Sequence, residues 1–213
     1  YGRGGLTKLG YAGSLAAALA YLVGQQGDPA GLLVFDERAR RYLPPSTRPG
    51  HVKDVFESLE KTEPLGRSDA ARALGHLADV VERRSLIVVF SDLLDAEGET
   101  WADPQRRKPG DGDARARGPV AERLAQLRSR GHDVVLFHVL DPDELELPFA
   151  DLTLFQAMEP GDARSLLADP DELRAAFATE SRLFRDRWRR ACLESRIEYR
   201  FVSTRERPAE VLR

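Results

Sequence analysis

The chain has 213 residues, of which 42% are hydrophobic and 31% are charged, and its formal net charge is −3. This length suits one α/β domain with a small extension. Nucleic-acid-binding domains normally carry a basic excess, and this slightly acidic chain has none, so we expect no nucleic-acid partner. No apolar run is long enough to span a bilayer and no signal-peptide pattern opens the chain, so we expect a soluble, cytoplasmic body without membrane contact.

Helical periodicity and turn residues alternate with short apolar runs along the first part of the chain. After the glycine-rich entry Tyr1–Gly5, apolar residues recur at spacings of three and four, which is typical of a helix with one buried face. Ser68 follows a loop and precedes a similar pattern, so we expect it to be the N-cap of a helix. The predicted elements are, in order, a helix over 6–26, strands over 31–35 and 39–43 that form a hairpin, a helix over 51–61 and a helix over 68–83.

The most informative stretch runs from Leu86 to Phe90. These five apolar residues are mostly β-branched or aromatic, which predicts a strand buried on both faces, as in a parallel α/β sheet. Ser91 and Asp92 follow at the carboxyl end of the strand, where open α/β sheets place their ligand crevices. Asp92 is therefore either a site residue or a loop cap that ends the strand.

A polar segment over 95–119 separates the two halves of the chain. It is rich in Gly, Pro, Asp and Arg and has almost no apolar residues, so we expect a mobile loop. We expect the single Cys192 to be a small core residue, because one cysteine cannot form an intramolecular disulfide. The elements predicted beyond the loop are a helix over 120–130, a strand over 132–140, short strands within 147–159 that extend the sheet, a helix over 169–195 and a strand over 197–202.

This alternation of helices and strands predicts an α/β fold with a doubly wound, mostly parallel sheet and helices on both faces. Asp141, Asp143 and Glu144 follow the strand over 132–140. Since the carboxyl ends of parallel strands meet at one edge, we expect these carboxylates in the same crevice region as Asp92.

Four stretches together resemble the von Willebrand factor A-like domain of the bacterial family called domain of unknown function 58 (DUF58). They are Lys8–Ala12 with Ala16–Leu22, Gly31–Asp36 with Tyr42–Pro45, Arg84–Asp92, and Gly131–Leu136 with Asp141–Pro142 and Glu144–Leu145. The resemblance implies a three-layer α/β/α, Rossmann-like fold for residues 1–213. It also implies work alongside MoxR-type AAA+ ATPases in the assembly or maturation of protein complexes.

The resemblance further implies a metal-ion-dependent adhesion site. In such domains Mg²⁺ is held by a D-x-S-x-S loop after the first strand, a Thr from a second loop and an Asp from a third. By position, Ser68 corresponds to the Thr and Asp92 to the Asp. No D-x-S-x-S occurs in these residues, and the family would place it just before Tyr1, so either the first strand was cut off or the protein lacks it. The resemblance thus implies an incomplete site at which Mg²⁺ binding is weak or absent.

Three classes of function remain open at this stage. The first is a protein-interaction module of the von Willebrand factor A type, and the second is a metal-dependent hydrolase that uses Asp92, Asp141 and Asp143. The third is a receiver-like or nucleotide-binding domain. The sequence favours the first, because it contains no G-x-S-x-G or H-E-x-x-H motif, no Cys/His cluster with ligand spacing and no phosphate-binding loop.

Overall fold

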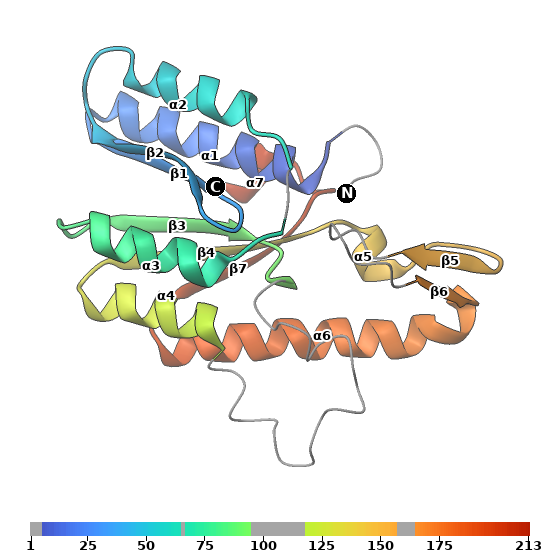
Figure 1. The fold of residues 1–213 in the computed structure, drawn as a ribbon. Coiled ribbons are helices and arrows are strands. Elements are labelled where there is room, and N and C mark those ends of the chain that lie inside the picture. The colour runs from blue at the N-terminus through green and yellow to red at the C-terminus, as the bar shows by residue number, and fades with distance from the viewer. Residues whose placement is uncertain (1–5, 65–66, 95–117, 157–164) are drawn as a thin grey trace.

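The computed structural model describes residues 6–64, 67–94, 118–156 and 165–213. At its centre lies a parallel sheet with strand order β3-β4-β7, formed by Leu86–Ser91, Asp133–Leu140 and Glu198–Ser203 (Figure 1). Helix α4 (Pro119–Ser129) connects β3 to β4, and α6 (Pro170–Glu194) lies between β4 and β7 in the chain. The strands predicted at 86–90, 132–140 and 197–202 are therefore confirmed as members of one parallel sheet.

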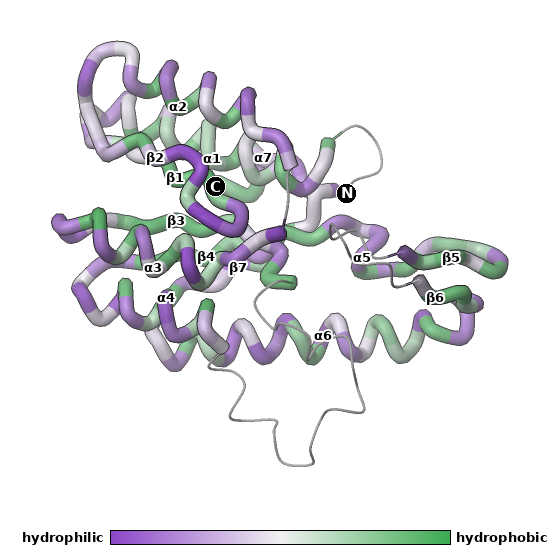
Figure 2. The backbone as a smooth tube through the Cα atoms, in the orientation of Figure 1, coloured by the Kyte–Doolittle hydropathy of each residue, from purple (hydrophilic) through white to green (hydrophobic). Residues whose placement is uncertain are grey.

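Successive side chains of each strand point to opposite faces of the sheet. Both faces therefore carry apolar side chains, and helices cover each of them. On β4, Val134 and Leu136 join a core built with α4, α6 and α3 (Ala70–Val80). Phe137 and Val139 join a second core with α1 (Lys8–Gln25), and the short α7 (Pro208–Val211) lies on the same side. Figure 2 shows β3 and β4 as hydrophobic, whereas the helices around them mix hydrophobic and hydrophilic residues.

The strand predicted at 31–35 is not part of the central sheet in the described residues. Strands β1 (Ala30–Phe35) and β2 (Ala39–Ser46) pair antiparallel as a two-stranded sheet, and α2 (His51–Glu60) follows them. This hairpin has a separate small core with α1 and α2, centred on Ala20, Ala30 and Val55. The three central strands succeed one another in chain order without a reversal, so the structure supports a mixed α/β fold and does not itself display doubly wound topology.

The start of α3 differs from the prediction by one residue. Asp69, and not Ser68, is the N-cap, because its carboxylate accepts a hydrogen bond from the Arg72 amide at 2.8 Å. An Asp side chain fills this role as well as a Ser side chain does, so the sequence alone did not separate the two. The Asp69 amide donates to the Asp36 carbonyl at 2.9 Å and thereby joins α3 to the β1-β2 hairpin.

The predicted extension at 147–159 is confirmed in part. Strand β5 (Thr153–Gln156) lies inside this range, but its partner β6 (Ser165–Ala168) lies beyond it. A short helix, α5 (Asp143–Glu146), connects this hairpin to β4. Of the polar segment predicted at 95–119, residues 95–117 lie outside the described residues, and Pro119 is the first residue of α4.

Two further observations concern the helices. Cys192 is a free, buried core residue of α6, as predicted, and burial raises the pKa of its thiol to about 12. None of the helices in the described parts of the chain combines the length and the apolar character needed to cross a bilayer.

Candidate functional site

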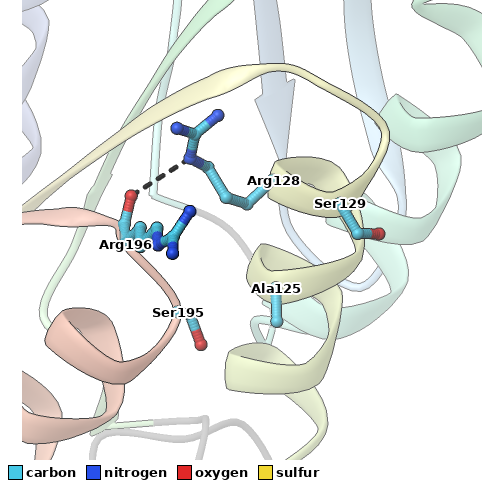
Figure 3. Close-up of a pocket in the computed structure, with 5 residues that line it drawn as sticks. All are labelled: Ala125, Arg128, Ser129, Ser195 and Arg196. Carbon is cyan, nitrogen blue, oxygen red and sulfur yellow. Dashed lines mark hydrogen bonds between the residues drawn. The ribbon is translucent and has the colours of Figure 1, made fainter.

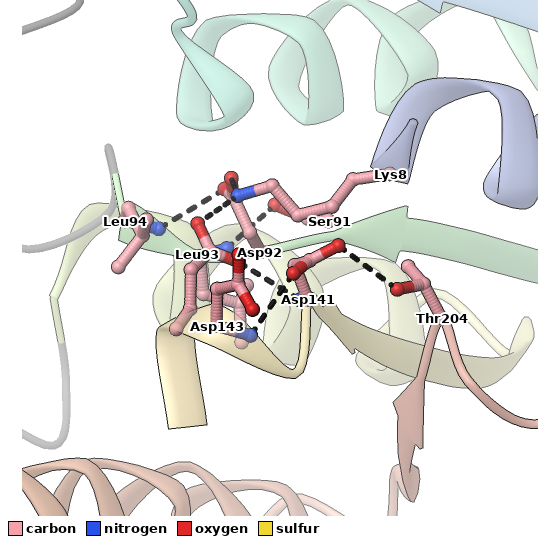
Figure 4. Close-up of polar contacts among 9 residues, drawn as sticks. Lys8, Ser91, Asp92, Leu93, Leu94, Asp141, Asp143 and Thr204 are labelled. Carbon is pink, nitrogen blue, oxygen red and sulfur yellow. Dashed lines mark hydrogen bonds and ion pairs between the residues drawn. The ribbon is translucent and has the colours of Figure 1, made fainter. Parts of the chain in front are cut away.

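The segments that follow β3, β4 and β7 meet the start of α1 at the carboxyl edge of the central sheet. Figure 4 shows Lys8 reaching from α1 toward Asp92, with Asp141 and Thr204 beside it. The Thr7 hydroxyl accepts a hydrogen bond from the Gly10 amide at 3.1 Å and caps α1, which makes Lys8 the first residue of that helix. The cap fixes the point from which the lysine side chain extends.

Lys8 is the central charge of this edge. Its Nζ donates to Asp92 Oδ2 at 2.7 Å and to Glu144 Oε1 at 2.6 Å. The side chain of Lys8 is 16% exposed, against 34% for Asp92 and 24% for Glu144. We call Lys8, Asp92 and Glu144 the edge triad.

The partly buried position of the triad affects the protonation of Lys8. Burial tends to lower the pKa of the Lys8 ammonium, but the charges and hydrogen bonds of Asp92 and Glu144 outweigh it and raise the pKa above 10.5. Lys8 therefore carries its positive charge throughout the physiological pH range.

The loop after β3 holds Asp92 in place through local hydrogen bonds. The Ser91 hydroxyl accepts from the Leu93 amide at 2.9 Å, and Asp92 Oδ1 accepts from the Leu94 amide at 3.3 Å. Leu93 has a φ of 61°, a left-handed conformation that is costly for a residue with a branched side chain. Its side chain is fully buried in the core beneath the sheet, and this burial offsets the backbone cost.

The loop after β4 is organised around the buried Asp141. Its carboxylate accepts from the Asp143 amide at 3.0 Å and from the Thr204 hydroxyl at 3.2 Å. The Asp141 amide in turn donates to Glu144 Oε2 at 2.9 Å, so Glu144 binds Lys8 with one oxygen and this loop with the other. These contacts connect the ends of β4 and β7 to the edge triad.

A buried histidine lies beside the triad in the sheet. His138 of β4 is fully buried, and its Nδ1 is 2.7 Å from the Tyr199 hydroxyl of β7. Burial lowers the pKa of His138 to about 4, although the nearby Asp92 carboxylate opposes this shift. His138 is therefore neutral at pH 7, and Nε2, which has no hydrogen-bond partner among the described residues, stays within the packed interior.

The structure brings together only part of the predicted site. Asp92 and the carboxylates after β4 share one edge, as predicted, and Glu144 is the member that joins them through Lys8. Ser68 is exposed before α3, and no hydrogen bond joins it to Asp92 among the described residues. Within the described ranges, no group of three or more His, Cys, Asp or Glu side chains is placed to hold a metal ion. These residues alone do not fit an octahedral Mg²⁺ site, and the cation nearest to Asp92 is an ammonium.

The sequence analysis did not identify Lys8 as a site residue. One signal was available: Lys8 is the only charged residue in the 18 residues of α1. A lysine at the first position of a helix is usually solvated, so this signal alone shows neither that Lys8 is buried against a carboxylate nor which carboxylate it pairs with.

A pocket of about 330 Å³ lies at the opposite edge of the sheet, between the ends of α4 and α6 (Figure 3). Its lining residues are Ala125, Arg128, Ser129, Ser195 and Arg196. Arg128 donates to the Arg196 carbonyl at 3.1 Å and to the His132 carbonyl at 2.9 Å, and it pairs with Asp133 at 3.2 Å. Its guanidinium thus supports the turn before β4, and we do not regard this pocket as the functional site.

Comparison with solved structures shows a similar fold. Conserved hypothetical protein BatB from Bacteroides thetaiotaomicron matches with a TM-score of 0.52 and 14% identity, over 96% of this chain and 83% of that chain. An aerotolerance-related membrane protein from Bacteroides fragilis NCTC 9343, carrying multiple mutations to serines, matches with a TM-score of 0.47 and 18% identity, over 91% of this chain and 80% of that one. At such identities the likeness to BatB concerns the fold.

Sequence relatives come from mycobacteria. The uncharacterised protein Rv1480 of Mycobacterium tuberculosis (strain ATCC 25618 / H37Rv) is 29% identical over 166 residues, which are 76% of this chain and 45% of that protein. The chain therefore spans less than half the length of this relative. Residues 1–187 match the family model described as "Protein of unknown function DUF58". Since this match covers most of the 213 residues, the chain belongs to the DUF58 family.

Proposed function

We propose that this chain is a protein-interaction module of the von Willebrand factor A type that binds its partner through the carboxyl edge of the central sheet. The observation that carries the proposal is the edge triad. Segments distant in the sequence meet there and present partly exposed carboxylates at one edge of the sheet. Membership of the DUF58 family and the fold similarity to BatB are consistent with such a module. Sites where loops meet at this edge of an α/β sheet are common positions for binding.

The finer parts of the proposal come from the family resemblance. They are a three-layer, doubly wound von Willebrand factor A-like fold in the complete protein, a MoxR-type AAA+ ATPase as partner and a cytoplasmic location. A Mg²⁺ site that includes Ser68 and Asp92 also belongs to the proposal. Because these two residues supply too few oxygen ligands, further ligands would have to come from elsewhere in the complete protein or from the partner.

Asp92 is the residue through which to test the proposal. We expect Asp92→Asn in the full-length protein to weaken binding of the MoxR-type ATPase from the same organism at least tenfold, because it removes the charge of the edge triad while keeping the side-chain shape. Binding is measured by biolayer interferometry at constant Mg²⁺ and nucleotide, because the ATPase itself depends on both.

Asp133→Asn is the matched control for this experiment. Asp133 is the first residue of β4, at the opposite edge, and it is about half exposed and paired with Arg84 and Arg128. We expect this variant to bind the partner as the unmodified protein does. Equal affinity of the Asp92→Asn variant and the unmodified protein would contradict an interaction site at this edge.

The alternative, a metal-dependent hydrolase, has less support. It requires Asp92, Asp141 and Asp143 to face a common substrate, but Asp141 is 2% exposed and its carboxylate is bound by Thr204 and the Asp143 amide. A carboxylate engaged in this way contributes to the structure of the loop and is poorly placed to act on a substrate.

A further inference from the structure

We propose that the pocket between the carboxyl ends of α4 and α6 binds an acidic segment of a protein partner, and that the Arg196 guanidinium pairs with a carboxylate of that segment. The pocket has a volume of about 330 Å³, and its lining is polar and basic apart from Ala125. It lies at the edge of the sheet opposite to the edge triad. It is therefore a second surface, separate from the one to which the proposed function is assigned.

The charges at this edge favour an acidic ligand. Arg84 and Arg128 share one carboxylate, that of Asp133, at 3.3 Å and 3.2 Å. The guanidinium of Arg196 forms no ion pair or hydrogen bond within the described part of the chain. The four side chains together carry a net charge of +2, which attracts anions. The exposed Glu194 on the last turn of α6 does not line the pocket.

Capping of the helices does not account for Arg196. The carboxyl ends of helices carry partial negative charge, and arginine side chains near them often bind the last carbonyl groups. Arg128 has this role, because it donates to the carbonyls of Arg196 and His132. The Arg196 guanidinium extends from the end of α6 toward α4 (Figure 3), and no carbonyl of the described residues accepts from it. Its charge is thus available to a ligand.

The backbone conformation of Arg196 gives independent support. Helices α1, α4 and α6 end in the same way, with a left-handed residue two positions after the last helical one. At α1 and α4 this residue is Gly27 and Gly131, with φ of 78° and 91°, whereas at α6 it is Arg196, with φ of 55°. Glycine adopts this conformation without steric cost and arginine does not. A strained arginine that lines a pocket points to a function of its side chain.

The surroundings favour a protein segment over a nucleic acid. Leu193, on the last turn of α6, is 76% exposed, the highest value among the large apolar side chains of the described residues. Protein interfaces combine arginine with apolar contacts, and a phosphate backbone has little apolar surface to cover Leu193. The net charge of −3 of the whole chain also opposes a polyanion.

The test measures peptide binding by the full-length protein with fluorescence anisotropy. The probe is a short fluorescein-labelled peptide of glutamate and leucine residues. We expect the unmodified protein to bind it with an affinity that falls as the salt concentration rises. Arg196→Gly should weaken binding about tenfold, and a peptide with glutamine in place of glutamate should bind as weakly as that variant does.

Arg182→Gln is the matched control. Arg182 is exposed on the same helix, about 20 Å before Arg196, and forms no ion pair with any described residue. This variant should bind the peptide as the unmodified protein does. Equal affinity of Arg196→Gly and the unmodified protein would overturn the proposal.

Thermal unfolding separates a role in binding from a role in the fold. Arg196→Gly should raise the Tm by about 2–4 °C, because glycine removes the steric cost of the left-handed turn. A variant that is more stable and binds the peptide less tightly supports the proposal. A lower Tm would show that Arg196 serves the fold and would contradict its assignment to a ligand.

Three further outcomes distinguish the possible occupants and the two surfaces. Tighter binding of a short RNA than of the glutamate peptide would refute an acidic protein segment as the ligand. Self-association of the unmodified protein that Arg196→Gly abolishes, measured by sedimentation, would identify a second copy as the occupant and refute a separate partner. Asp92→Asn should leave the peptide affinity unchanged, so this proposal and the proposed function can fail independently. Loss of peptide binding in Asp92→Asn would contradict a separate second surface.

Discussion

At the scale of single residues, this structure buries several polar side chains and leaves some of their atoms without a hydrogen-bond partner among the described residues. His138 is an example, because it is fully buried in β4, where its Nδ1 has Tyr199 as partner and the Phe184 ring lies 5.4 Å away. The sheet therefore contains a neutral imidazole at a position where an apolar side chain would be expected.

The depressed pKa of His138 predicts a loss of stability in acid. The unfolded chain takes up this proton near pH 6.5, whereas the folded chain takes it up near pH 4, so protonation favours unfolding between these values. The free energy of unfolding should fall by up to about 3 kcal/mol from this group as the pH drops to 4, and the group should contribute almost no pH dependence once the pH is about one unit above 6.5, where the imidazole is neutral in both states. Asp92, Arg185 and Lys8 are the charged groups that act on it.

Urea unfolding at a series of pH values tests this prediction with His138→Asn, whose amide can replace the bond from Nδ1. The variant should show a flatter dependence on pH between 6.5 and 4. His76→Gln is the control, because His76 is exposed on α3, and it should retain the slope of the unmodified chain. Equal slopes for His138→Asn and the unmodified chain would rule out His138 as the source.

At the scale of elements, apolar runs and helical periodicity predicted most boundaries to within a few residues. The parallel strands are the best case, because the run from Leu86 to Phe90 is short and mostly β-branched or aromatic, which favours a strand over a segment of buried helix. The antiparallel β1-β2 hairpin was predicted as a hairpin, but its separation from the central sheet was not. Membership of a sheet depends on which strand edges meet in space. A strand of this length has the same local sequence pattern whether it joins the central sheet or forms a separate hairpin.

The N-cap of α3 gives a direct test at this scale. Asp69→Ala should lower the free energy of unfolding by about 1 kcal/mol, because the Arg72 amide loses its acceptor. Ser68→Ala should change it by less than about 0.5 kcal/mol, because Ser68 is exposed and does not cap the helix. Both are measured by chemical denaturation. A larger cost for Ser68→Ala than for Asp69→Ala would mean that the helix begins one residue earlier.

At the scale of the whole molecule, the candidate site depends on contacts that no local pattern specifies. Lys8 lies 84 residues from Asp92 and 136 residues from Glu144 in the sequence. The position of Asp92 after a buried strand predicted the edge where it lies. The ammonium that pairs with Asp92 comes from Lys8, on a helix near the start of the chain. The sequence therefore predicted where the site lies. That a lysine pairs with its carboxylates became known only from the three-dimensional structure.

These long separations also have a consequence for the kinetics of folding. The two ion pairs close very long loops, so they can form only after the helices and the sheet have assembled, and they are expected to be absent from the folding transition state. Lys8→Met should then accelerate unfolding and leave the folding rate nearly unchanged, as stopped-flow kinetics would show. A slower folding rate in this variant would instead place the contact in the nucleus. The lysine is thus expected to prolong the lifetime of the native state without helping the chain to reach it.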